Sequence, residues 1–391
     1  MKVTVSTEAH LRRGPDGVVR SDTAGRAYDF WAHYLSAFDQ VEVVARVSES
    51  DHHEGFTVEG HGVTVMDIDG YSGLVATARA VPQMRLLASA IARSRSAKIL
   101  RLPSPIGSQI AAACRRVGDP YAVEVVGDPV EVLSTGVVPR PLRPILRRLA
   151  ARSMRRDVQL ADAASYVTRE VLQFRYPASS AKFVTHYSSV HLPPEAFADV
   201  DRPTRDAASV VTAVGTQSQM YKGHDLLIEA AAILYHRGGA IEVRLVGAGR
   251  YQDDLRALAN DLGIAGHVKF IGSLPDGKAV REELDRADLV AMPSRTEGLP
   301  RALIEAMARG VPCIGSDVGA IPELLESEEL FPGGNAQLLA ELIQAVLHSP
   351  ARREEMGVRN LAKARQYAAP VLTAKRDRYY ETVRRQRSPT G

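Results

Sequence analysis

Apolar residues recur along this chain in two spacings, and the two spacings alternate. In the first half, short runs rich in β-branched residues predict strands at "MKVTVSTEAH", "QVEVVARV", "SAKILRLPS" and "PYAVEVVGDP". Between some of them, "AGRAYDFWAHYLSAF" and "SQIAAACRRVG" have the spacing of helices. Because strands and helices alternate, this half predicts a parallel sheet with helices on both of its faces.

A second alternating series begins near Ala208. It predicts strands at "ASVVTAVG", "IEVRLVGAG", "HVKFIGSLP" and "DLVAMPS", with helices at "HDLLIEAAAILYHRG", "YQDDLRALANDLG" and "DGKAVREELDRA". The connector at residues 192–207, "LPPEAFADVDRPTRDA", is rich in Pro and Asp and has neither spacing. We therefore expect two doubly wound α/β domains with a cleft between them, covering residues 1–200 and 208–367. A last helix is expected at "PVLTAKRDRYYETVRRQR".

The amino-acid composition and net charge indicate which class of protein this chain belongs to. The chain has 391 residues, 45% hydrophobic and 24% charged, which is ordinary for a globular protein long enough for two cores. Its net charge of +3 is too small to indicate a nucleic-acid partner. Cys114 and Cys313 have no metal-ligand spacing and are expected to be reduced thiols. With no signal-peptide pattern and no apolar run of about 18 residues, we expect a cytoplasmic protein.

The stretch at residues 139–156, "PRPLRPILRRLAARSMRR", differs from the rest of the first half. Leu142, Ile145, Leu146 and Leu149 fall on one helical face, and arginines surround it. One interpretation is a surface helix with a solvated basic side. The other is a basic patch that makes a peripheral contact with a membrane or a phosphorylated acceptor.

The stretch "SRTEGLPRALIEAMARG" places two glutamates around a proline. Pro300 suits the first turn of a helix, so Glu297, Gly298 and Leu299 are expected in the loop before it, at the carboxyl end of the strand "DLVAMPS". The amides of Gly298 and Leu299 favour a diphosphate. Glu305 lies on the helix and its side chain points back toward the same ligand, where it would suit a ribose diol.

A second loop, in "VTAVGTQSQMYKGHDLLIEA", adds a cation. Lys222 lies between a strand and a helix, and it is one of only eight lysines among 49 Lys and Arg residues. An ammonium group at this position suits a phosphate. Gly247 and Gly249, at another strand end, form only a lone G-x-G.

These segments resemble the family 4 glycosyltransferases, which are retaining nucleotide-sugar transferases of the GT-B fold. The resemblance covers residues 210–325, and "EGLPRALIE", with its two glutamates, is its most specific part. It implies two Rossmann-like domains facing across a cleft, with residues 368–391 as a helix crossing back to the first domain. The residues that it implies for donor binding are Gly215, Thr216, Lys222, Gly249, Arg250, Glu297, Gly298, Leu299, Pro300 and Glu305.

Two departures from the family pattern affect catalysis. Thr216 stands where the family usually has an arginine on the diphosphate, so either Lys222 acts with a second cation such as Arg250, Arg12 or Arg13, or the diphosphate is held more loosely. In the first domain, Asp128 stands in the region where many members carry a histidine. The candidate catalytic residues are therefore Lys222, Glu297 and Asp128.

The expected reaction needs neither a metal nor a cofactor. No Asp-x-Asp motif lies at a strand end with the sequence context of a metal site, and "QDDL" falls in a predicted helix. The acceptor hydroxyl would attack from the same face as the departing diphosphate and give its proton to that phosphate. The candidates for binding the acceptor lie near strand ends and loops of the first domain: Glu8, His10, Gly17, Glu124 and Asp128.

The sequence leaves the substrates open. A UDP-sugar is the expected donor on family habit. The arginine-rich composition is typical of GC-rich genomes, which suggests a small polar acceptor such as an aminocyclitol antibiotic intermediate. The alternatives are a cell-envelope glycan or lipid-linked acceptor, favoured by the basic stretch, and an inactive nucleotide-sugar-binding subunit. A dinucleotide oxidoreductase is disfavoured because "STEAHLRRGPDG" lacks a G-x-G-x-x-G.

Overall fold

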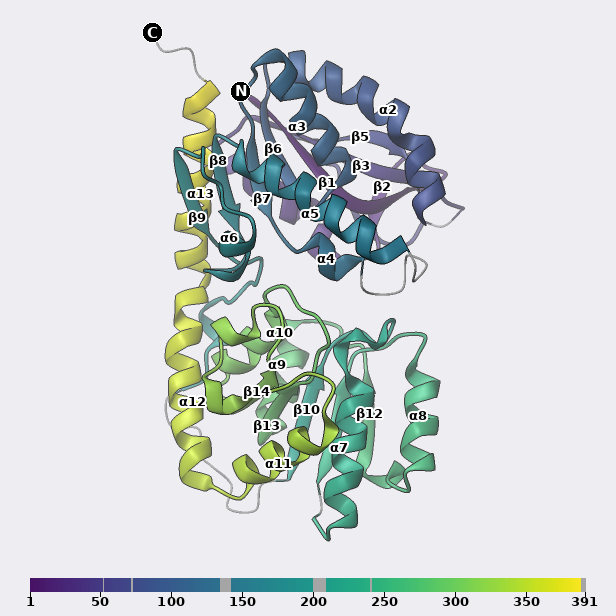
Figure 1. Ribbon diagram of the computed structural model, residues 1–391, viewed down its shortest axis with the longest axis vertical. Coiled ribbons are helices and arrows are strands. Elements are labelled where there is room, and N and C mark those ends of the chain that lie inside the picture. The colour runs from purple at the N-terminus through teal and green to yellow at the C-terminus, as the bar shows by residue number, and fades with distance from the viewer. Residues whose placement is uncertain (52, 72, 134–141, 200–208, 240, 388–391) are drawn as a thin grey trace. The chain divides into compact units, whose positions relative to one another are not determined.

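The computed structural model contains two sheets, one in each of two compact units (Figure 1). It describes the chain except residues 52, 72, 134–141, 200–208, 240 and 388–391. Unit 1 comprises the described residues of Met1–Tyr187 and Thr373–Gly391, and unit 2 those of Ser188–Leu372. The first division therefore falls at Ser188, ahead of the connector, and the second falls at Thr373.

The sheet of unit 1 has nine strands, and most of its pairs are parallel as the alternation predicts. A parallel path runs β5-β3-β1-β6-β7-β8-β9, while the short β2 pairs antiparallel with β1 and β4. The register of β1 against β3 shifts between Ser6 and His10. The strands are β1 (Lys2–Arg13), β2 (Val19–Ser21), β3 (Gln40–Glu49), β4 (Phe56–Thr57), β5 (Val63–Asp69), β6 (Ala97–Leu102), β7 (Ala122–Val125), β8 (Ala163–Tyr166) and β9 (Phe183–His186).

Helices cover the sheet of unit 1, and one of them comes from the far end of the chain. The expected helix at "AGRAYDFWAHYLSAF" is only five residues of α-helix followed by a 3-10 turn. Between β3 and β6 the structure has β5 and the long α2, for which the sequence analysis gave no element. The helices are α1 (Tyr28–Ala32), α2 (Gly73–Arg93), α3 (Pro105–Val117), α4 (Pro129–Val132), α5 (Arg143–Gln159), α6 (Val171–Arg175) and the long α13 (Ala369–Arg387).

Unit 2 is a six-stranded, wholly parallel sheet in the order β12-β11-β10-β13-β14-β15. Its strands are β10 (Val210–Val214), β11 (Glu242–Val246), β12 (Val268–Gly272), β13 (Leu289–Met292), β14 (Cys313–Ser316) and β15 (Leu330–Phe331). Its helices are α7 (His224–His236), α8 (Gln252–Asp261), α9 (Gly277–Arg286), α10 (Arg301–Ala308), α11 (Ala336–Leu347) and α12 (Pro350–Ala364). The strands predicted from the second alternating series all occur.

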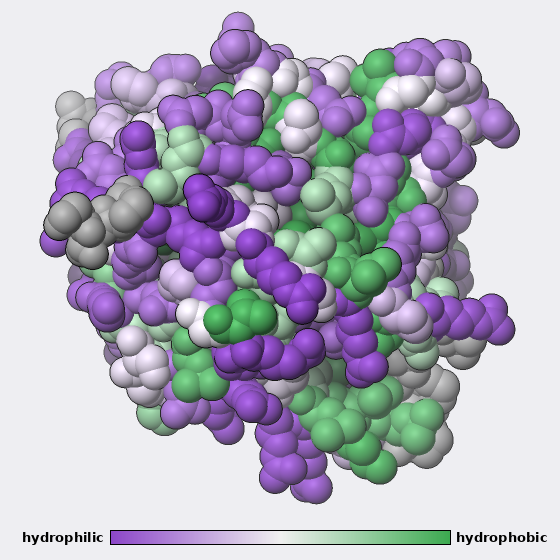
Figure 2. All heavy atoms as spheres, turned by 90° about the horizontal axis from the view of Figure 1, so that it is seen from above, coloured by the Kyte–Doolittle hydropathy of each residue, from purple (hydrophilic) through white to green (hydrophobic). Residues whose placement is uncertain are grey.

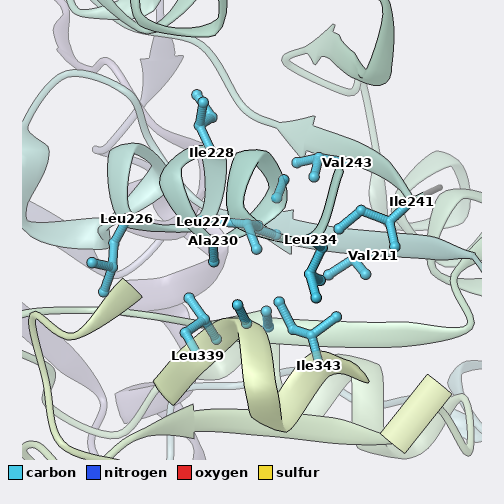
Figure 3. Close-up of a cluster of buried hydrophobic side chains, with 14 of the residues drawn as sticks. Val211, Leu226, Leu227, Ile228, Ala230, Leu234, Ile241, Val243, Leu339 and Ile343 are labelled. Carbon is cyan, nitrogen blue, oxygen red and sulfur yellow. The ribbon is translucent and has the colours of Figure 1, made fainter. Parts of the chain in front are cut away.

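The core of unit 2 lies where α7 and α11 pack on the central strands (Figure 3). The alanine-rich sequence of α7 lets its neighbours approach closely, and Leu227 and Ile228 are fully buried. Leu339 and Ile343 of α11 lie on the side of α7 that carries Ala230 and Leu234, whereas Ile228 points away from α11 (Figure 3). Complete burial of one such side chain contributes about 2 kcal/mol, so this core fixes the strands whose ends carry the candidate site.

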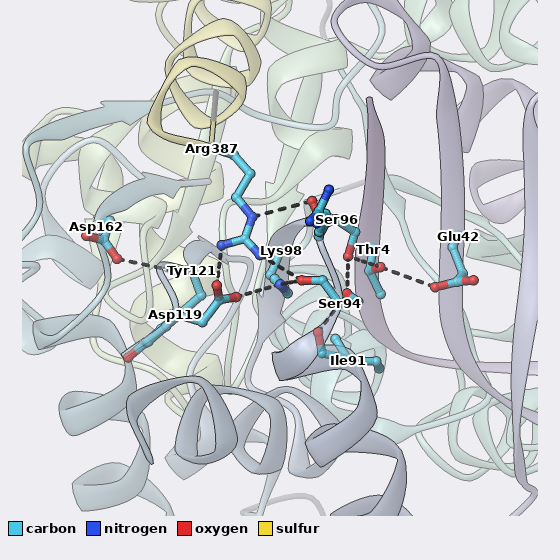
Figure 4. Close-up of polar contacts among 11 residues, drawn as sticks. Thr4, Glu42, Ile91, Ser94, Ser96, Lys98, Asp119, Tyr121, Asp162 and Arg387 are labelled. Atoms are coloured by element: carbon cyan, nitrogen blue, oxygen red, sulfur yellow. Dashed lines mark hydrogen bonds and ion pairs between the residues drawn. The ribbon is translucent and has the colours of Figure 1, made fainter. Parts of the chain in front are cut away.

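A polar cluster in unit 1 joins α13 to the sheet (Figure 4). Arg387 pairs with Asp119 and donates to the Ser94 carbonyl at 2.7 Å, and Asp119 also pairs with Lys98. Lys98 is 1% exposed, and this burial lowers its pKa.

Both cysteines are buried and form no disulfide. Outside the cores, the face of the molecule in Figure 2 is mainly hydrophilic, with separate hydrophobic patches.

Candidate functional site

Two loops of unit 2 meet at the carboxyl edge of its sheet. One follows β10 and contains Lys222, and the other follows β13 and contains Glu297. Since β10 and β13 are adjacent parallel strands, their carboxyl ends lie at the same edge. The loops touch at Gly223, whose φ is +71°, because a Cβ there would lie 1.9 Å from the Pro293 carbonyl oxygen. Glycine is therefore required at the junction.

Lys222 and Glu297, predicted to bind one donor, are in direct contact. Lys222 Nζ lies 2.6 Å from Glu297 Oε1, and Ser294 Oγ donates to the same oxygen at 2.8 Å. Glu297 is 9% exposed. Among the described residues, none donates a hydrogen bond to the other carboxylate oxygen, Oε2. The pair thus keeps one oxygen of Glu297 and two N–H groups of Lys222 available to a ligand.

Further contacts hold the Glu297 loop in place. A Cβ on Gly319, whose φ is +56°, would lie 1.8 Å from the Glu297 carbonyl oxygen. The amide of Ala320 donates to the Gly298 carbonyl at 3.2 Å. The backbone that presents Glu297 is therefore packed against the loop after β14, which the sequence analysis did not include in the site.

Arg295 joins the two loops, and the sequence analysis did not single it out. Its guanidinium binds Asp225 of α7 at 2.7 and 2.9 Å and the Met220 carbonyl at 2.7 Å. Its amide donates to the Tyr221 carbonyl at 2.7 Å. Because Asp225 neutralises its charge, Arg295 positions Lys222 and Glu297 and is not a spare cation.

The predicted residues of the G-x-G region lie at the same edge of the sheet. Gly249 has no room for a side chain, since a Cβ would lie 2.0 Å from the Ser218 amide nitrogen. Thr216 is exposed, and its hydroxyl accepts from the same amide at 3.1 Å. The Arg250 guanidinium is also exposed and lies 4.9 Å from the centre of the Tyr251 ring.

Helix α10 begins beside Glu297 and carries Glu305. Pro300 precedes the helix with an extended backbone, whereas the sequence placed it in the first turn. Gly298 and Leu299 lie in the loop, both partly exposed. Burial raises the pKa of Glu305, although the charges of Arg301 and Arg281 oppose that shift. No hydrogen bond to its carboxylate is found in the part of the chain that the structure describes.

His224, next to Gly223 at the start of α7, is a site neighbour that the sequence analysis missed. It is buried, and desolvation together with the Lys222 charge lowers the pKa of its imidazole to about 4. It is therefore neutral at neutral pH and adds no charge beside Lys222. Its position directly after "KG" was the only sequence signal.

In unit 1, Glu8 and His10 lie in the second half of β1. Glu8 accepts hydrogen bonds from Tyr71 at 2.9 Å and from Ser104 at 2.8 Å. His10 is largely exposed and its Nε2 lies 3.1 Å from Ser48 Oγ; partial desolvation of the ring and then the charge of Arg46 lower its pKa. Gly17 lies in the exposed loop between β1 and β2.

Asp128 and Glu124, which the sequence analysis placed near a strand end of the first domain, are both buried. Asp128 caps α4 and accepts from Tyr176 at 2.6 Å and from Arg175 at 2.7 Å. Glu124 is 2% exposed, and the hydroxyls of Tyr34 and Tyr187 each donate to it at 2.9 Å.

These two carboxylates are thus occupied by internal partners, and we leave them out of the proposed site. Their partners come from distant segments, so the sequence around "YAVEVVGDP" gave no sign of them. Across the described residues, no three His, Cys, Asp or Glu side chains gather as a metal site would require.

The chain is similar in sequence to several known proteins. Residues 201–362 match the family model described as glycosyl transferases group 1. The chain is 27% identical to Protein CapJ of Staphylococcus aureus over 86% of this chain and 84% of that protein. It is 36% identical to the GDP-mannose-dependent monoacylated alpha-(1-6)-phosphatidylinositol monomannoside mannosyltransferase of Corynebacterium glutamicum, over 35% of this chain and 37% of that protein.

Solved structures extend the similarity to the whole fold. Sucrose-phosphate synthase of Thermosynechococcus elongatus has a TM-score of 0.71 at 17% identity, covering 99% of this chain and all of that one. Anabaena Alr3699/HepE, solved in complex with UDP, has a TM-score of 0.65 at 16% identity, covering 98% of this chain and all of that one. At these identities the likeness shows the fold, which is of the GT-B type.

Proposed function

Because this chain is a glycosyltransferase of the GT-B fold, with a group 1 glycosyl transferase domain at residues 201–362, we propose that unit 2 binds a nucleoside diphosphate sugar and that the sugar passes to a hydroxyl group of a cell-envelope acceptor. The observation that supports this most is the Lys222–Glu297 pair, 2.6 Å apart at the carboxyl edge of the sheet. A cation and a carboxylate side by side suit the two ends of a sugar diphosphate.

We assign a separate part of the donor to each group. Lys222 and the amides of Gly298 and Leu299 bind the diphosphate. The unpartnered Oε2 of Glu297 accepts from a sugar hydroxyl, and Glu305 accepts from the ribose. The raised pKa of Glu305 supports this, since a desolvated carboxylate gains most from hydroxyl donors.

The proposed reaction retains the configuration of the sugar. The bond from the anomeric carbon to the diphosphate oxygen breaks as a bond to the acceptor oxygen forms on the same face. The acceptor proton passes to the departing phosphate oxygen. Lys222 and the loop amides stabilise the negative charge on that leaving group, and they are in place before the reaction. We expect activity without a metal or cofactor, which a chelator would test.

The relatives favour an envelope acceptor over the small antibiotic intermediate. Their names include the phosphatidylinositol mannoside enzymes of Corynebacterium and Mycobacterium and an amylovoran enzyme of Erwinia amylovora. The aminocyclitol acceptor stays a prediction from composition alone. The donor base is also open, since the names of the phosphatidylinositol monomannoside mannosyltransferases print GDP-mannose while the HepE structures hold UDP or UDP-glucose. UDP and a cytoplasmic location remain predictions.

Thermal stabilisation by a panel of UDP- and GDP-sugars tests the donor site. We expect one donor to raise the melting temperature of the wild type and to be slowly hydrolysed. Each of the variants Lys222→Ala, Glu297→Gln and Glu305→Gln should weaken the apparent affinity for that donor at least tenfold, and so reduce the thermal stabilisation. A tenfold loss of affinity corresponds to about 1.4 kcal/mol of binding free energy. Lys278→Ala removes an exposed lysine of α9 and should bind as wild type does.

The outcomes separate the alternatives. Equal stabilisation of the wild type and all three site variants would show that the donor site is elsewhere. Stabilisation without hydrolysis or transfer to any membrane extract would instead support a donor-binding subunit without activity.

A further inference from the structure

Helix α5 has an apolar face that points away from the core of unit 1. Its inner side is secured by Met154 and Val158, both buried, and by Asp157, which pairs with Arg115 of α3 at 2.9 Å. Figure 1 shows α5 on the outside of the unit. With its inner side filled, the apolar residues on its other side have no core to join.

Those outer residues form a stripe. Ile145 and Leu149 are 59% and 56% exposed, and Leu142, just before the helix, is 48% exposed. Spacings of three and four residues place the three on the same side of a helix. Single exposed apolar residues are common, but three aligned on one helix make a continuous surface.

Arginines extend and flank this stripe. Arg148, Arg152 and Arg156 are exposed. Neither Arg148 nor Arg152 forms an ion pair with any carboxylate that the structure describes. The single acidic residue of α5, Asp157, is turned inward. The outer side of α5 therefore combines aliphatic side chains with positive charge and carries no negative charge.

We propose that this surface, formed by Leu142, Ile145, Arg148, Leu149, Arg152 and Arg156 and called here the α5 face, docks peripherally on a bilayer that contains anionic lipids. In such docking the aliphatic side chains enter the boundary of the acyl chains and the guanidinium groups bind lipid phosphates. No described helix of the chain has the length and apolarity to cross a bilayer, so the contact is at the surface.

The positive charge of the α5 face distinguishes an anionic bilayer from the other partners that could bind there. In a two-fold contact between copies of the chain, the arginines of one face would oppose those of the other. A nucleic acid would leave the aliphatic stripe without a role. An anionic bilayer satisfies both components together.

Docking would bring the enzyme to acceptors held in the membrane. That consequence rests on the proposed function, whereas the docking itself rests on the α5 face alone. Exposed apolar side chains occur elsewhere on the surface, as Figure 2 shows, so the test needs a matched control. Arg85 and Leu86 on α2 provide one, because both are exposed and Leu86 is 77% so.

The experiment is co-sedimentation of the full chain with vesicles of phosphatidylcholine, with and without phosphatidylglycerol. We expect binding only with phosphatidylglycerol, weakening as salt is added. Arg148→Gln with Arg152→Gln should lower the partition coefficient about 25-fold, since each arginine contributes about fivefold at an anionic surface. Ile145→Ser with Leu149→Ser should also lower the partition coefficient, although the charge of the α5 face stays the same. Arg85→Gln with Leu86→Ser should bind as wild type.

Two results would overturn the proposal: no binding of the wild type to anionic vesicles, or equal binding by the α5 variants. A dimer lost in the α5 variants, without vesicle binding, would assign the face to a second copy instead. Donor stabilisation should be unchanged in every α5 variant, which also shows that they fold. If no donor stabilised the wild type, that result would count against the proposed donor site. The vesicle-binding result would remain valid.

Discussion

His224 is buried beside Lys222, and its burial makes the stability of the protein depend on pH. The pKa of its imidazole is about 4 in the folded chain against 6.5 ordinarily, so the unfolded chain binds a proton more readily between these values. The contribution of the neutral, buried His224 to the free energy of unfolding is fully present above about pH 6.5. It is lost as the pH falls toward 4, and the loss reaches about 3 kcal/mol.

His224→Gln should therefore flatten the fall in unfolding free energy between pH 6.5 and 4, measured by urea titration at several pH values. His236→Gln, at an exposed position at the end of α7, should leave the wild-type slope unchanged. A slope that stays the same in His224→Gln would show that other groups cause the acid sensitivity.

At the scale of elements, the loop after β14 supports the loop that carries Glu297. A methyl group on Gly319 would collide with the Glu297 carbonyl oxygen and would occupy a left-handed backbone. Gly319→Ala should destabilise the protein by about 3 kcal/mol and weaken donor stabilisation, because Glu297 must move. Gly263→Ala has a similar φ of +72° with open space around it, so it measures the backbone cost alone.

The comparison of melting temperature and donor affinity in these two glycine variants decides the point. If Gly319→Ala binds the donor as tightly as Gly263→Ala does, the close approach of Gly319 to the Glu297 carbonyl oxygen does not position Glu297 for binding.

These elements also show how far the sequence could predict the site. Lys222 and Glu297 were predictable because each lies in a loop at the end of a parallel strand, and topology brings such loops together. Asp225 as the partner of Arg295, and Tyr34 and Tyr187 as partners of Glu124, were not. Those contacts depend on side-chain directions and on packing between distant segments, and residue spacing encodes neither.

At the scale of the whole molecule, α13 completes unit 1 from the far end of the chain. Tyr379 and Tyr380 are buried in its core, and Arg387 pairs with Asp119. Asp119→Asn would leave Lys98 buried without its carboxylate, which should lower the unfolding free energy by about 3 kcal/mol.

Urea unfolding followed by tyrosine fluorescence would measure the Asp119→Asn effect. Asp51→Asn, at an exposed loop position, is the control and should stay within about 0.5 kcal/mol of wild type. A loss no larger than that of the control would mean that the Asp119 cluster is not a stabilising anchor.

The division of the chain has a consequence for biosynthesis. Unit 2 is one continuous stretch, whereas unit 1 is interrupted and needs Tyr379, Tyr380 and Val383 to fill its core. Those side chains are translated only after all of unit 2. On a ribosome, where domains fold as they emerge, unit 2 can therefore close its core while unit 1 is still waiting for its last helix. The half of the protein that is made first is the half that finishes folding last.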